Sequence, residues 1–382
     1  MSDPASASDG RQVLVVGDGL GGLSAAAFLR QRGLDPTVVG GPGEDGVAGR
    51  CITLWHTGVE LLAELEVRAE RTPSAVGIEA WLPSTGDGAV LDRLETGHGR
   101  DHPFLAVDRA PLRRALREHL PTNSIRVTKT PRTLRTDDGP LVVEFEDGVR
   151  ERFDLVVGAD GTDSWVRSAG FDAPEPTPWG TTTWTFRTDR EPGTAGTVAE
   201  LWCSDGMLAV VGGPSGTCGR FVTTVGDPQA AAAVLAGAFE AADHPVLDGL
   251  VPPGQDALEG SADRVLRADP WVTDRVALLG DAAHSLPPGL TLGPSLAVED
   301  AYVLAEEVAG GNPPAAALGR YQDRRRGRLR RLDRRAAAGG GVRRRPLAIE
   351  GLPDLREARF ALLRSSFARH PDGTTGPLDG RL

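Results

Sequence analysis

A glycine-rich turn between a short apolar run and a helical segment constrains the fold of this chain most. Val13–Val16 is a continuous apolar run of the kind that forms a buried parallel strand. The sequence GDGLGG follows at residues 17–22, and residues 23–31 then have the apolar spacing of a helix. A second apolar run begins at Thr37. This order predicts a βαβ unit in an open parallel sheet.

The glycines have the spacing Gly-x-Gly-x-x-Gly, which is typical of a dinucleotide-binding turn. The first glycine allows the tight turn, the second lets the backbone approach a pyrophosphate, and the third lets helix and strand pack closely. Unpaired N–H groups and the helix dipole then face the phosphates. We expect the phosphates at Gly17, Gly19, Leu20, Gly21 and Gly22. The alternative is a glycine-rich turn without a ligand.

A carboxylate about 20 residues after this turn usually holds the ribose hydroxyls. That position, at the end of the second strand, falls at Gly40. Either Glu44 or Asp45 reaches back from a remodelled loop, or the ribose is held without a carboxylate.

Two later segments also place an aspartate directly after a buried apolar run. Residues 154–167 read DLVVGADGTDSWVR, and residues 275–288 read RVALLGDAAHSLPP. The aspartates, Asp160 and Asp281, would lie at the carboxyl end of the sheet, where ligands bind in α/β folds. With the glycine turn, and in this order and spacing, the chain resembles the flavin-dependent aromatic monooxygenases of the p-hydroxybenzoate hydroxylase type over most of residues 11–335.

This resemblance implies a single-chain enzyme that binds FAD and takes electrons from NADPH or NADH as a transient donor. Dioxygen would then form a flavin C4a-hydroperoxide that hydroxylates or epoxidises a small organic substrate, with aromatic and polyketide-like compounds expected first. The chain has no second pyrophosphate fingerprint for a stably bound nicotinamide, which agrees with a transient donor. The flavin carries the difficult chemistry, so the protein contributes orientation, exclusion of water and stabilisation of charge.

The resemblance also implies roles for four polar residues. Asp281 would accept hydrogen bonds from the ribityl hydroxyls, and Asp160 would lie near the pyrophosphate and the nicotinamide donor. Arg109, at the start of a helix, and Arg50 would contact FAD. The alternatives are a helix cap for Asp281, a simple Asp-Gly turn for Asp160 and a surface ion pair for Arg109. We interpret His284 as a packed structural residue rather than a base.

The segment after the second aspartate would flank the reacting face of the flavin. Pro287, Pro288 and Gly289 are expected to form the catalytic loop beside that face. Residues 289–300 read GLTLGPSLAVED, where relatives have a Gly-Gln-Gly stretch and an asparagine. Backbone N–H groups at the start of the following helix, at Gly293, Ser295 and Leu296, would face the N1–O2 edge of the flavin. Pro294 has no N–H to donate there.

The middle of the chain changes character. Four apolar, alternating runs between about residues 171 and 268 predict an antiparallel sheet inserted into the parallel one. The fold class is therefore α/β, a Rossmann-like FAD-binding domain of the glutathione-reductase type with an inserted, mainly antiparallel β-sheet substrate domain. We expect the FAD-binding domain at 11–70, 101–170 and 269–335, the substrate domain at 71–100 and 171–268, and a C-terminal helical segment or tail at 336–382.

The substrate would lie between the flavin and the inserted sheet. By position alone, the candidates that line its pocket are Trp55, Thr183, Trp184, Phe186, Trp202 and Met207. Core packing is the alternative role for each of them.

Composition narrows the remaining classes of function. The net charge of −11 disfavours nucleic-acid binding, and we interpret the arginine-rich run at 320–335 as a solvated helix. Three cysteines without CxxC spacing argue against a disulfide scaffold and a cysteine zinc site, and they favour a reducing cytoplasm. The chain shows no signal-peptide pattern and no apolar run of membrane-spanning length. The sequence does not predict an oligomeric state.

Two further functions stay open at this point. One is another flavin redox enzyme on the same fold, such as a reductase, a dehydrogenase or a halogenase. The other is a degenerate, non-catalytic flavoprotein relative, suggested by Gly40 and by the altered stretch from Thr291 to Ser295.

Overall fold

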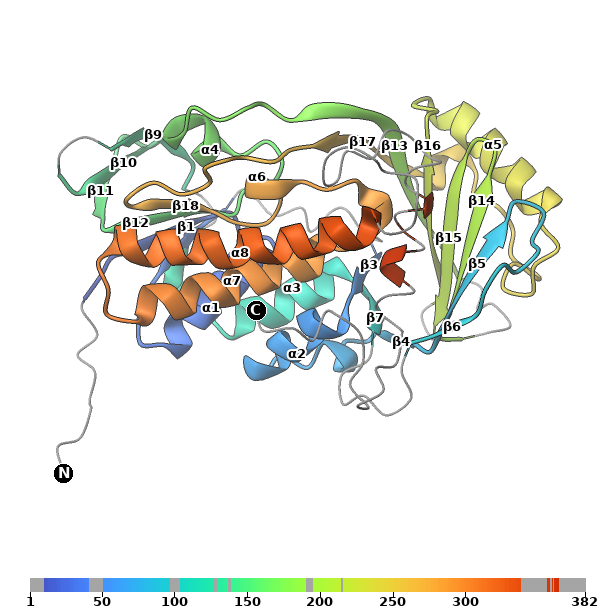
Figure 1. Cartoon of the computed structure of the whole chain (residues 1–382), viewed down its shortest axis with the longest axis horizontal. Coiled ribbons are helices and arrows are strands. Elements are labelled where there is room, and N and C mark those ends of the chain that lie inside the picture. Colours follow the sequence, from blue (N-terminus) through green and yellow to red (C-terminus); the bar gives the residue numbers. More distant parts are fainter. Residues whose placement is uncertain are drawn as a thin grey trace.

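The computed structural model describes residues 10–40, 51–96, 104–126, 129–136, 139–189, 195–213, 216–337, 356–357, 359 and 361–363. Two sheets organise these residues, and they stand at opposite ends of the molecule in Figure 1. A five-stranded sheet with its helices forms one end, and a seven-stranded sheet with one covering helix forms the other. None of the helices in the described ranges is long and apolar enough to cross a membrane.

The five-stranded sheet is parallel throughout, in the order β18-β12-β1-β2-β8. Its strands are β1 (Val13–Val16), β2 (Thr37–Val39), β8 (Ile125–Arg126), β12 (Leu155–Gly158) and β18 (Val276–Leu278). Strands β1, β12 and β18 are buried along their whole length, because helices cover the sheet. These helices are α1 (Leu20–Gln31), α3 (Arg109–Glu118), α7 (Gly293–Ala309) and α8 (Pro314–Ala337), with α1 packed on α7 and α7 packed on α8.

Shorter elements surround this sheet. One three-stranded sheet contains β9 (Pro131–Arg135), β10 (Leu141–Phe145) and β11 (Arg150–Phe153), and α4 (Trp165–Gly170) lies against it. Another contains β3 (Cys51–Leu54), β4 (Val76–Ile78) and β7 (Phe104–Asp108), and α2 (His56–Glu64) packs beside it. The remaining short helices are α6 (Asp281–His284), η1 (Ala69–Arg71), η2 (Thr122–Ser124), η3 (Gln255–Ala257) and η4 (Pro288–Leu290).

The seven-stranded sheet has the order β17-β13-β16-β15-β14-β5-β6 and is antiparallel except between β14 and β5. The strands are β5 (Ala80–Thr85), β6 (Leu94–Glu95), β13 (Thr177–Thr188), β14 (Thr197–Cys203), β15 (Gly206–Gly213), β16 (Gly216–Thr223) and β17 (Glu259–Val265). Helix α5 (Pro228–Ala241) packs on one face of this sheet, where Trp184 and Phe186 contribute to an apolar cluster. The other face is turned toward the five-stranded part (Figure 1).

The fold class predicted from the sequence is confirmed, with small shifts at element ends. The apolar spacing of residues 23–31, and likewise that of residues 57–66, predicts a helix, and the helices run over Leu20–Gln31 and His56–Glu64. The sequence pattern also predicts a helix over residues 228–241, and α5 has these bounds. The strand-rich region from about residue 72 to 98 divides its strands between two sheets, because β4 pairs with β7 whereas β5 pairs with β14.

Candidate active site

The glycine turn lies where β1, β12 and α1 meet. Gly17 has a φ of +109°, and a β-carbon on it would lie 2.3 Å from the carbonyl oxygen of Ala159. A β-carbon on Gly22 would lie 1.9 Å from the carbonyl oxygen of Gly17. Only glycine fits these two positions, so helix α1 starts close against the strands. A β-carbon on Gly21 would lie 2.7 Å from Leu279, whereas one on Gly19 would lie 3.4 Å from the Arg109 guanidinium.

The missing strand-end carboxylate is replaced in space by another acid. A β-carbon on Gly40 would lie 2.4 Å from the carboxyl carbon of Asp18, so the Asp18 side chain fills the place of a side chain at Gly40. Arg113 donates to the Asp18 carboxylate and, at 2.9 Å, to its carbonyl oxygen. The guanidinium of Arg117 lies 3.6 Å from the same carboxylate. Glu44 and Asp45, the candidates from sequence, lie outside the described residues.

Asp281 begins α6 directly after β18. Gly280 has a φ of +58° and donates its N–H to Asp300 at 2.8 Å, which fixes the turn before Asp281. Asp281 keeps accessible surface because it lines a cavity, yet burial among protein groups raises its pKa while His284 and Arg109 lower it. Its carboxylate accepts no hydrogen bond within the described part of the chain, so its oxygens are available to hydroxyl donors of a ligand.

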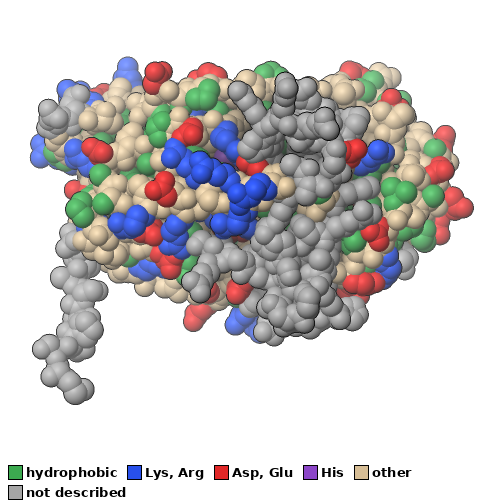
Figure 2. All heavy atoms as spheres, viewed as in Figure 1, with side chains coloured by type: hydrophobic (Ala, Val, Ile, Leu, Met, Phe, Trp, Pro, Cys, Tyr) green, Lys and Arg blue, Asp and Glu red, His purple; other side chains and the backbone are tan. Residues whose placement is uncertain are grey.

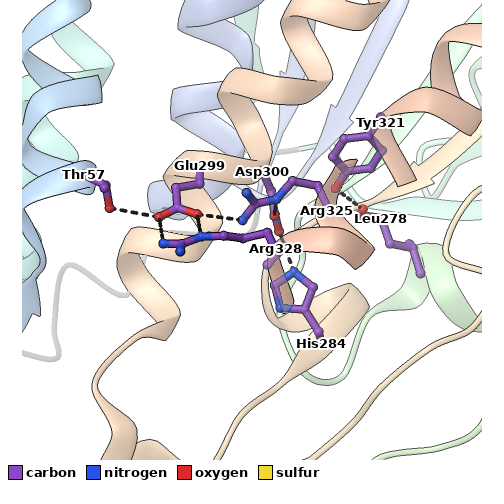
Figure 3. A network of polar contacts seen from close by, with 9 residues as sticks. Thr57, Leu278, His284, Glu299, Asp300, Tyr321, Arg325 and Arg328 are labelled. Carbon is purple, nitrogen blue, oxygen red and sulfur yellow. Dashed lines mark hydrogen bonds and ion pairs between the residues drawn. The ribbon is translucent and has the colours of Figure 1, made fainter. Parts of the chain in front are cut away.

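A buried ionic network between α7 and α8 supports the turn at Gly280. Figure 3 shows Arg325 and Arg328 of α8 reaching the neighbouring acids Glu299 and Asp300 of α7. Arg328 makes a two-pronged contact with Glu299 at 2.9 and 2.8 Å, and Arg325 binds Asp300 at 2.5 Å. His284 lies 2.7 Å from the same Asp300 carboxylate. His284 is therefore a packed structural residue, as expected.

This network corrects the interpretation of the arginine-rich run as a solvated helix. Arg325 and Arg328 are 0% and 1% exposed, because their spacing of three residues places both on the side of α8 that faces α7. Burial alone would raise the pKa of Glu299, but Arg328 and Arg325 lower it to about 2. The run does present basic side chains on its outer side, and Figure 2 shows Lys and Arg gathered over this face.

Helix α7 starts beside Asp281. A β-carbon on Gly293 would lie 3.7 Å from an Asp281 carboxylate oxygen, and Pro294 follows in the first turn. The Ser295 hydroxyl accepts the backbone N–H of Trp55 at 2.8 Å. The Leu296 N–H donates to the Leu292 carbonyl at 3.0 Å, so it is engaged within the helix rather than directed at a ligand.

The expected catalytic loop lies at the same place. Pro287 lines the cavity, and Pro288 and Gly289 form the short helix η4 that follows it. Thr291 then adopts a φ of +54°, which is rare for a β-branched residue. Arg359 donates to the Leu290 carbonyl at 2.6 Å and to the Thr291 hydroxyl at 2.8 Å, so a residue near the C-terminus holds this segment.

One cavity of about 280 Å³ lies between the segment from Asp281 to Pro294 on its first side and the seven-stranded sheet on the other. Arg109, Asp281, Pro287, Thr291, Gly293 and Pro294 line it from the first side, and Thr183, Thr185, Arg220, Ser261 and Asp263 line it from the sheet. The cavity is therefore built by segments that lie far apart in the sequence.

Asp263 is the acid on the sheet side of the cavity. Thr181 and Thr183 donate to its carboxylate at 2.5 and 3.1 Å. Burial raises the pKa of Asp263 to about 6, although these hydrogen bonds and the nearby Arg220 oppose the shift. Burial also lowers the pKa of Arg220 from its ordinary value. The cavity thus holds a cation and an acid whose pKa is raised to about 6.

Strand alternation separates the candidate pocket residues. Thr183 lines the cavity, whereas Trp184 and Phe186, on the opposite face of β13, pack in the cluster beneath α5. Trp55, Trp202 and Met207 are buried in the main core and do not line this cavity. The side chain of Trp55 lies 5.1 Å from the Phe104 ring, centroid to centroid. For these five, the structure favours the core-packing alternative.

Asp160 and Arg50 are the two remaining residues that were expected beside the flavin. Both carboxylate oxygens of Asp160 are engaged, one with the Ser164 hydroxyl at 2.6 Å and one with the Val166 N–H at 3.1 Å. Asp160 thus fixes the turn before α4. Arg50 lies outside the described residues.

The described groups fit an extended dinucleotide. Arg109 lies between the two ends of the site, since its guanidinium is 3.4 Å from the β-carbon position of Gly19 and it also lines the cavity with Asp281. A phosphate turn, a cation and a carboxylate acceptor for hydroxyls therefore follow one another toward the cavity. Sequence reasoning missed Asp18, Arg220, Asp263 and Arg359, because each acquires its position through pairing between distant segments.

Comparisons with known proteins agree with this geometry. The FAD binding domain family matches residues 11–204 and 251–336. The chain is 29% identical over 367 residues to the 3-amino-4-hydroxybenzoate 2-monooxygenase PtmB3 of Streptomyces platensis, covering 86% of this chain and 87% of the relative. It is 30% identical over 315 residues to the FAD-dependent urate hydroxylase of Mycolicibacterium vanbaalenii, covering 77% and 78%.

Among solved structures, the fold is similar to that of Klebsiella pneumoniae HpxO complexed with FAD and uric acid. The TM-score is 0.73 at 24% identity, covering 86% of this chain and 88% of that one. FAD, the predicted cofactor, is confirmed by the family match, and an NADPH or NADH donor is typical of such monooxygenases. Since the family match covers most of the chain and its relatives are monooxygenases, the chain belongs to the FAD binding domain family of FAD-dependent monooxygenases.

Proposed function

We propose that this monooxygenase hydroxylates a small planar aromatic or heteroaromatic compound that carries an acidic hydroxyl or carboxylate group. The observation that carries the proposal is the single cavity that Asp281 and Pro287 share with Arg220 and Asp263. Its volume of about 280 Å³ is at the lower end of small-molecule sites, which suits one or two fused rings.

The first side of the cavity serves the cofactor. FAD, when bound, supplies electron transfer from NADPH or NADH and the activation of dioxygen. We assign the phosphates to Gly17, Gly19, Leu20, Gly21 and Gly22, with Arg109 as their cationic partner. Asp281 would accept hydrogen bonds from the ribityl hydroxyls. The start of α7 at Gly293, with the backbone of Ser295, and the loop Pro287, Pro288 and Gly289 would hold the flavin.

The sheet side serves the substrate. The Arg220 guanidinium binds an anionic oxygen of the substrate, because a desolvated cation in a cavity lacks solvent screening. Asp263, whose pKa is about 6, accepts the proton of the substrate hydroxyl, which makes the ring more electron-rich. The substrates named for two relatives, 3-amino-4-hydroxybenzoate and urate, are compact ring compounds of this kind.

The proposal also covers the domain organisation of the protein, its partners and its location in the cell. The seven-stranded sheet, with segments 71–100 and 171–268, is the substrate part, and segments 11–70, 101–170 and 269–335 form the FAD-binding part. Net charge, and the burial of Arg325 and Arg328 in ion pairs, support small molecules and dioxygen rather than nucleic acid as partners. The three cysteines without CxxC spacing support a cytoplasmic location.

A substrate screen tests the proposed function. The holoenzyme is incubated with hydroxylated benzoates, hydroxypyridines, purines and polyketide-like phenols, and stimulated NADPH or NADH oxidation is measured. Isotope-labelled dioxygen then shows whether oxygen enters the product. Stimulated oxidation with label in a hydroxylated ring supports the proposal.

Other outcomes separate the alternatives. Donor oxidation without incorporation, whether or not another product forms, indicates a reductase, a dehydrogenase or a halogenase. Bound FAD that no donor reduces indicates a non-catalytic relative. Label in aliphatic or uncharged compounds alone would overturn the assigned substrate class while leaving the enzyme class standing.

A further inference from the structure

Two cysteines that are far apart in the sequence meet beside the cavity. Cys51 is the first residue of β3, and Cys218 lies within β16 of the seven-stranded sheet. The two sulfur atoms and a carboxylate oxygen of Asp108 all lie within 4.8 Å of one another. We propose that Cys51 and Cys218 form a dithiol that hydrogen peroxide oxidises to a disulfide, which joins the FAD-binding part to the substrate sheet.

Strand pairing holds the two thiols in register. Cys51 is the pairing partner of Asp108 on β7, and Cys218 is the pairing partner of Arg187 on β13. Arg187 in turn forms an ion pair with Asp108. The four side chains therefore make a closed group in which one ion pair and one thiol pair cross between the same two sheets. A disulfide needs its sulfurs about 2.05 Å apart, so the thiols must approach by less than about 3 Å.

The charges of this group favour oxidation over metal binding. A hydrogen bond from the Cys51 thiol lowers the pKa of Cys218, and Arg187 acts in the same direction against the effect of burial. The same hydrogen bond and burial raise the pKa of Cys51. One sulfur is thus the better thiolate and the other keeps its proton. A metal cation would compete with Arg187 for Asp108 and would face the positive charge of Arg220.

The cavity gives a small oxidant access to the pair. Cys51 lines the cavity directly. Arg220 lines it two residues after Cys218 on β16, and alternation along the strand turns both side chains to the same face. The thiol pair therefore lies at the edge of the substrate cavity.

The oxidation balances with peroxide as the only oxidant. The Cys218 thiolate attacks one peroxide oxygen, the O–O bond breaks, and with one proton the products are a sulfenic acid and water. The Cys51 sulfur then attacks the sulfenic sulfur, the S–O bond breaks, and the oxygen leaves as a second water. Two thiols lose two electrons and two protons in total, and one peroxide is reduced to two waters.

The full-length holoenzyme, with all three cysteines present, tests the proposal. Peroxide is added in stoichiometric amounts, free thiols are titrated, and intact and peptide masses are measured. We expect two of three thiols to disappear, the protein to lose the mass of two hydrogens, and one linked peptide to contain Cys51 and Cys218. The oxidised protein should melt several degrees higher, because the cross-link restricts the unfolded chain, and a dithiol reductant should reverse the change.

Matched serine variants complete the test. Cys203→Ser removes the third cysteine and should still form the link, whereas Cys51→Ser and Cys218→Ser should each lose it. Cys218→Ala covers the case in which the serine variant folds poorly. A link that involves Cys203, stable sulfinic acid at either residue without a link, or a stoichiometric metal ion that protects both thiols would each overturn the proposal.

Discussion

At the residue scale, the Asp18 carboxylate occupies the position at which the usual sequence pattern places an acid at the end of the second strand. Asp18 belongs to the phosphate turn, yet its carboxyl group occupies the side-chain position of Gly40 at the end of β2. Arg113 and Arg117 orient it. A carboxylate at this point suits the hydroxyls of the adenosine ribose.

Asp18→Asn should therefore weaken FAD binding about tenfold, because a hydrogen bond to a charged acceptor is lost. Binding of FMN, which lacks the adenosine, should change much less. The dissociation constants of both flavins for the apoprotein, measured by fluorescence quenching, check this expectation.

A relocated carboxylate provides the control. Asp18→Gly combined with Gly40→Asp should recover much of the FAD affinity that Asp18→Gly alone loses. Equal losses for FAD and FMN would show that Asp18 only supports the turn.

Asp263 gives the second prediction at this scale. Because its pKa is about 6, its base form is present above pH 6 and is lost as the pH falls through that value. Substrate-stimulated kcat/KM of the wild type should rise through about pH 6 and then level off. Asp263→Asn should remove this rise and lower kcat/KM about 100-fold.

Thr181→Val serves as the matched variant. It removes a hydrogen bond to the Asp263 carboxylate, which raises the pKa of Asp263. The rise in kcat/KM should therefore shift to higher pH. A wild-type rise near pH 6 that persists in Asp263→Asn would exclude Asp263 as its source.

At the element scale, helices α7 and α8 depend on the ionic network between them. The two acids Glu299 and Asp300 are buried (Figure 3). Removal of Arg325 or Arg328 would therefore leave a buried carboxylate without its charged partner. Removing one partner of such a pair costs far more than the pair contributes on its own. The network also fixes the turn at Gly280, which precedes Asp281.

Arg325→Met should lower the free energy of unfolding by about 3–5 kcal/mol, measured by denaturant titration. Arg330→Met, on the exposed side of the same helix, is the control and should change it by less than about 0.5 kcal/mol. Equal effects of the two variants would contradict the role of the network.

The network also predicts an acid dependence. In the folded protein the pKa of Glu299 is about 2, below its ordinary value of 4.5. A depressed pKa contributes stability above the ordinary value, and this contribution is lost as the pH falls from about 4.5 to 2. Wild-type stability should fall across this range, and the fall should be smaller in Arg328→Met, whose Glu299 has a less depressed pKa.

At the scale of the whole molecule, a residue near the C-terminus connects the two parts. Arg359 is buried, and it binds Glu200 of β14 at 3.1 Å and the Leu290 carbonyl at 2.6 Å. Its guanidinium also lies 4.4 Å from the Trp81 ring centroid. The seven-stranded sheet and the end of η4 therefore share one cation.

Arg359→Met should reduce the free energy of unfolding by about 3–5 kcal/mol, since Glu200 stays buried without its charged partner. Adding Glu200→Gln should recover part of the loss. Arg356→Met, at an exposed position nearby, is the control. Thermal melting of the four proteins checks this, and no recovery in the double variant would exclude the pairing as the cause.

Much of the fold could be predicted because its signals are local. Buried runs such as Val13–Val16 and Leu155–Gly158 report parallel strands, and the glycines and aspartates that follow them mark the ligand edge of the sheet. Helix α5 was predicted to the residue, since Asp227 caps it and Pro228 starts it. The sheet side of the cavity gave no such signal, because Arg220 and Asp263 lie in ordinary alternating strands.

The amino-acid sequence by itself determined the strand–turn–helix units and the order in which they follow one another, since these depend on residues within one turn or one strand. Tertiary structure decided which distant groups became neighbours. It brought Asp18 to Gly40, Asp263 to the cavity, the arginines of α8 to the acids of α7, and Cys51 to Cys218. The physical reason is that burial, charge pairing and strand register depend on how remote segments pack, and no local spacing records that packing.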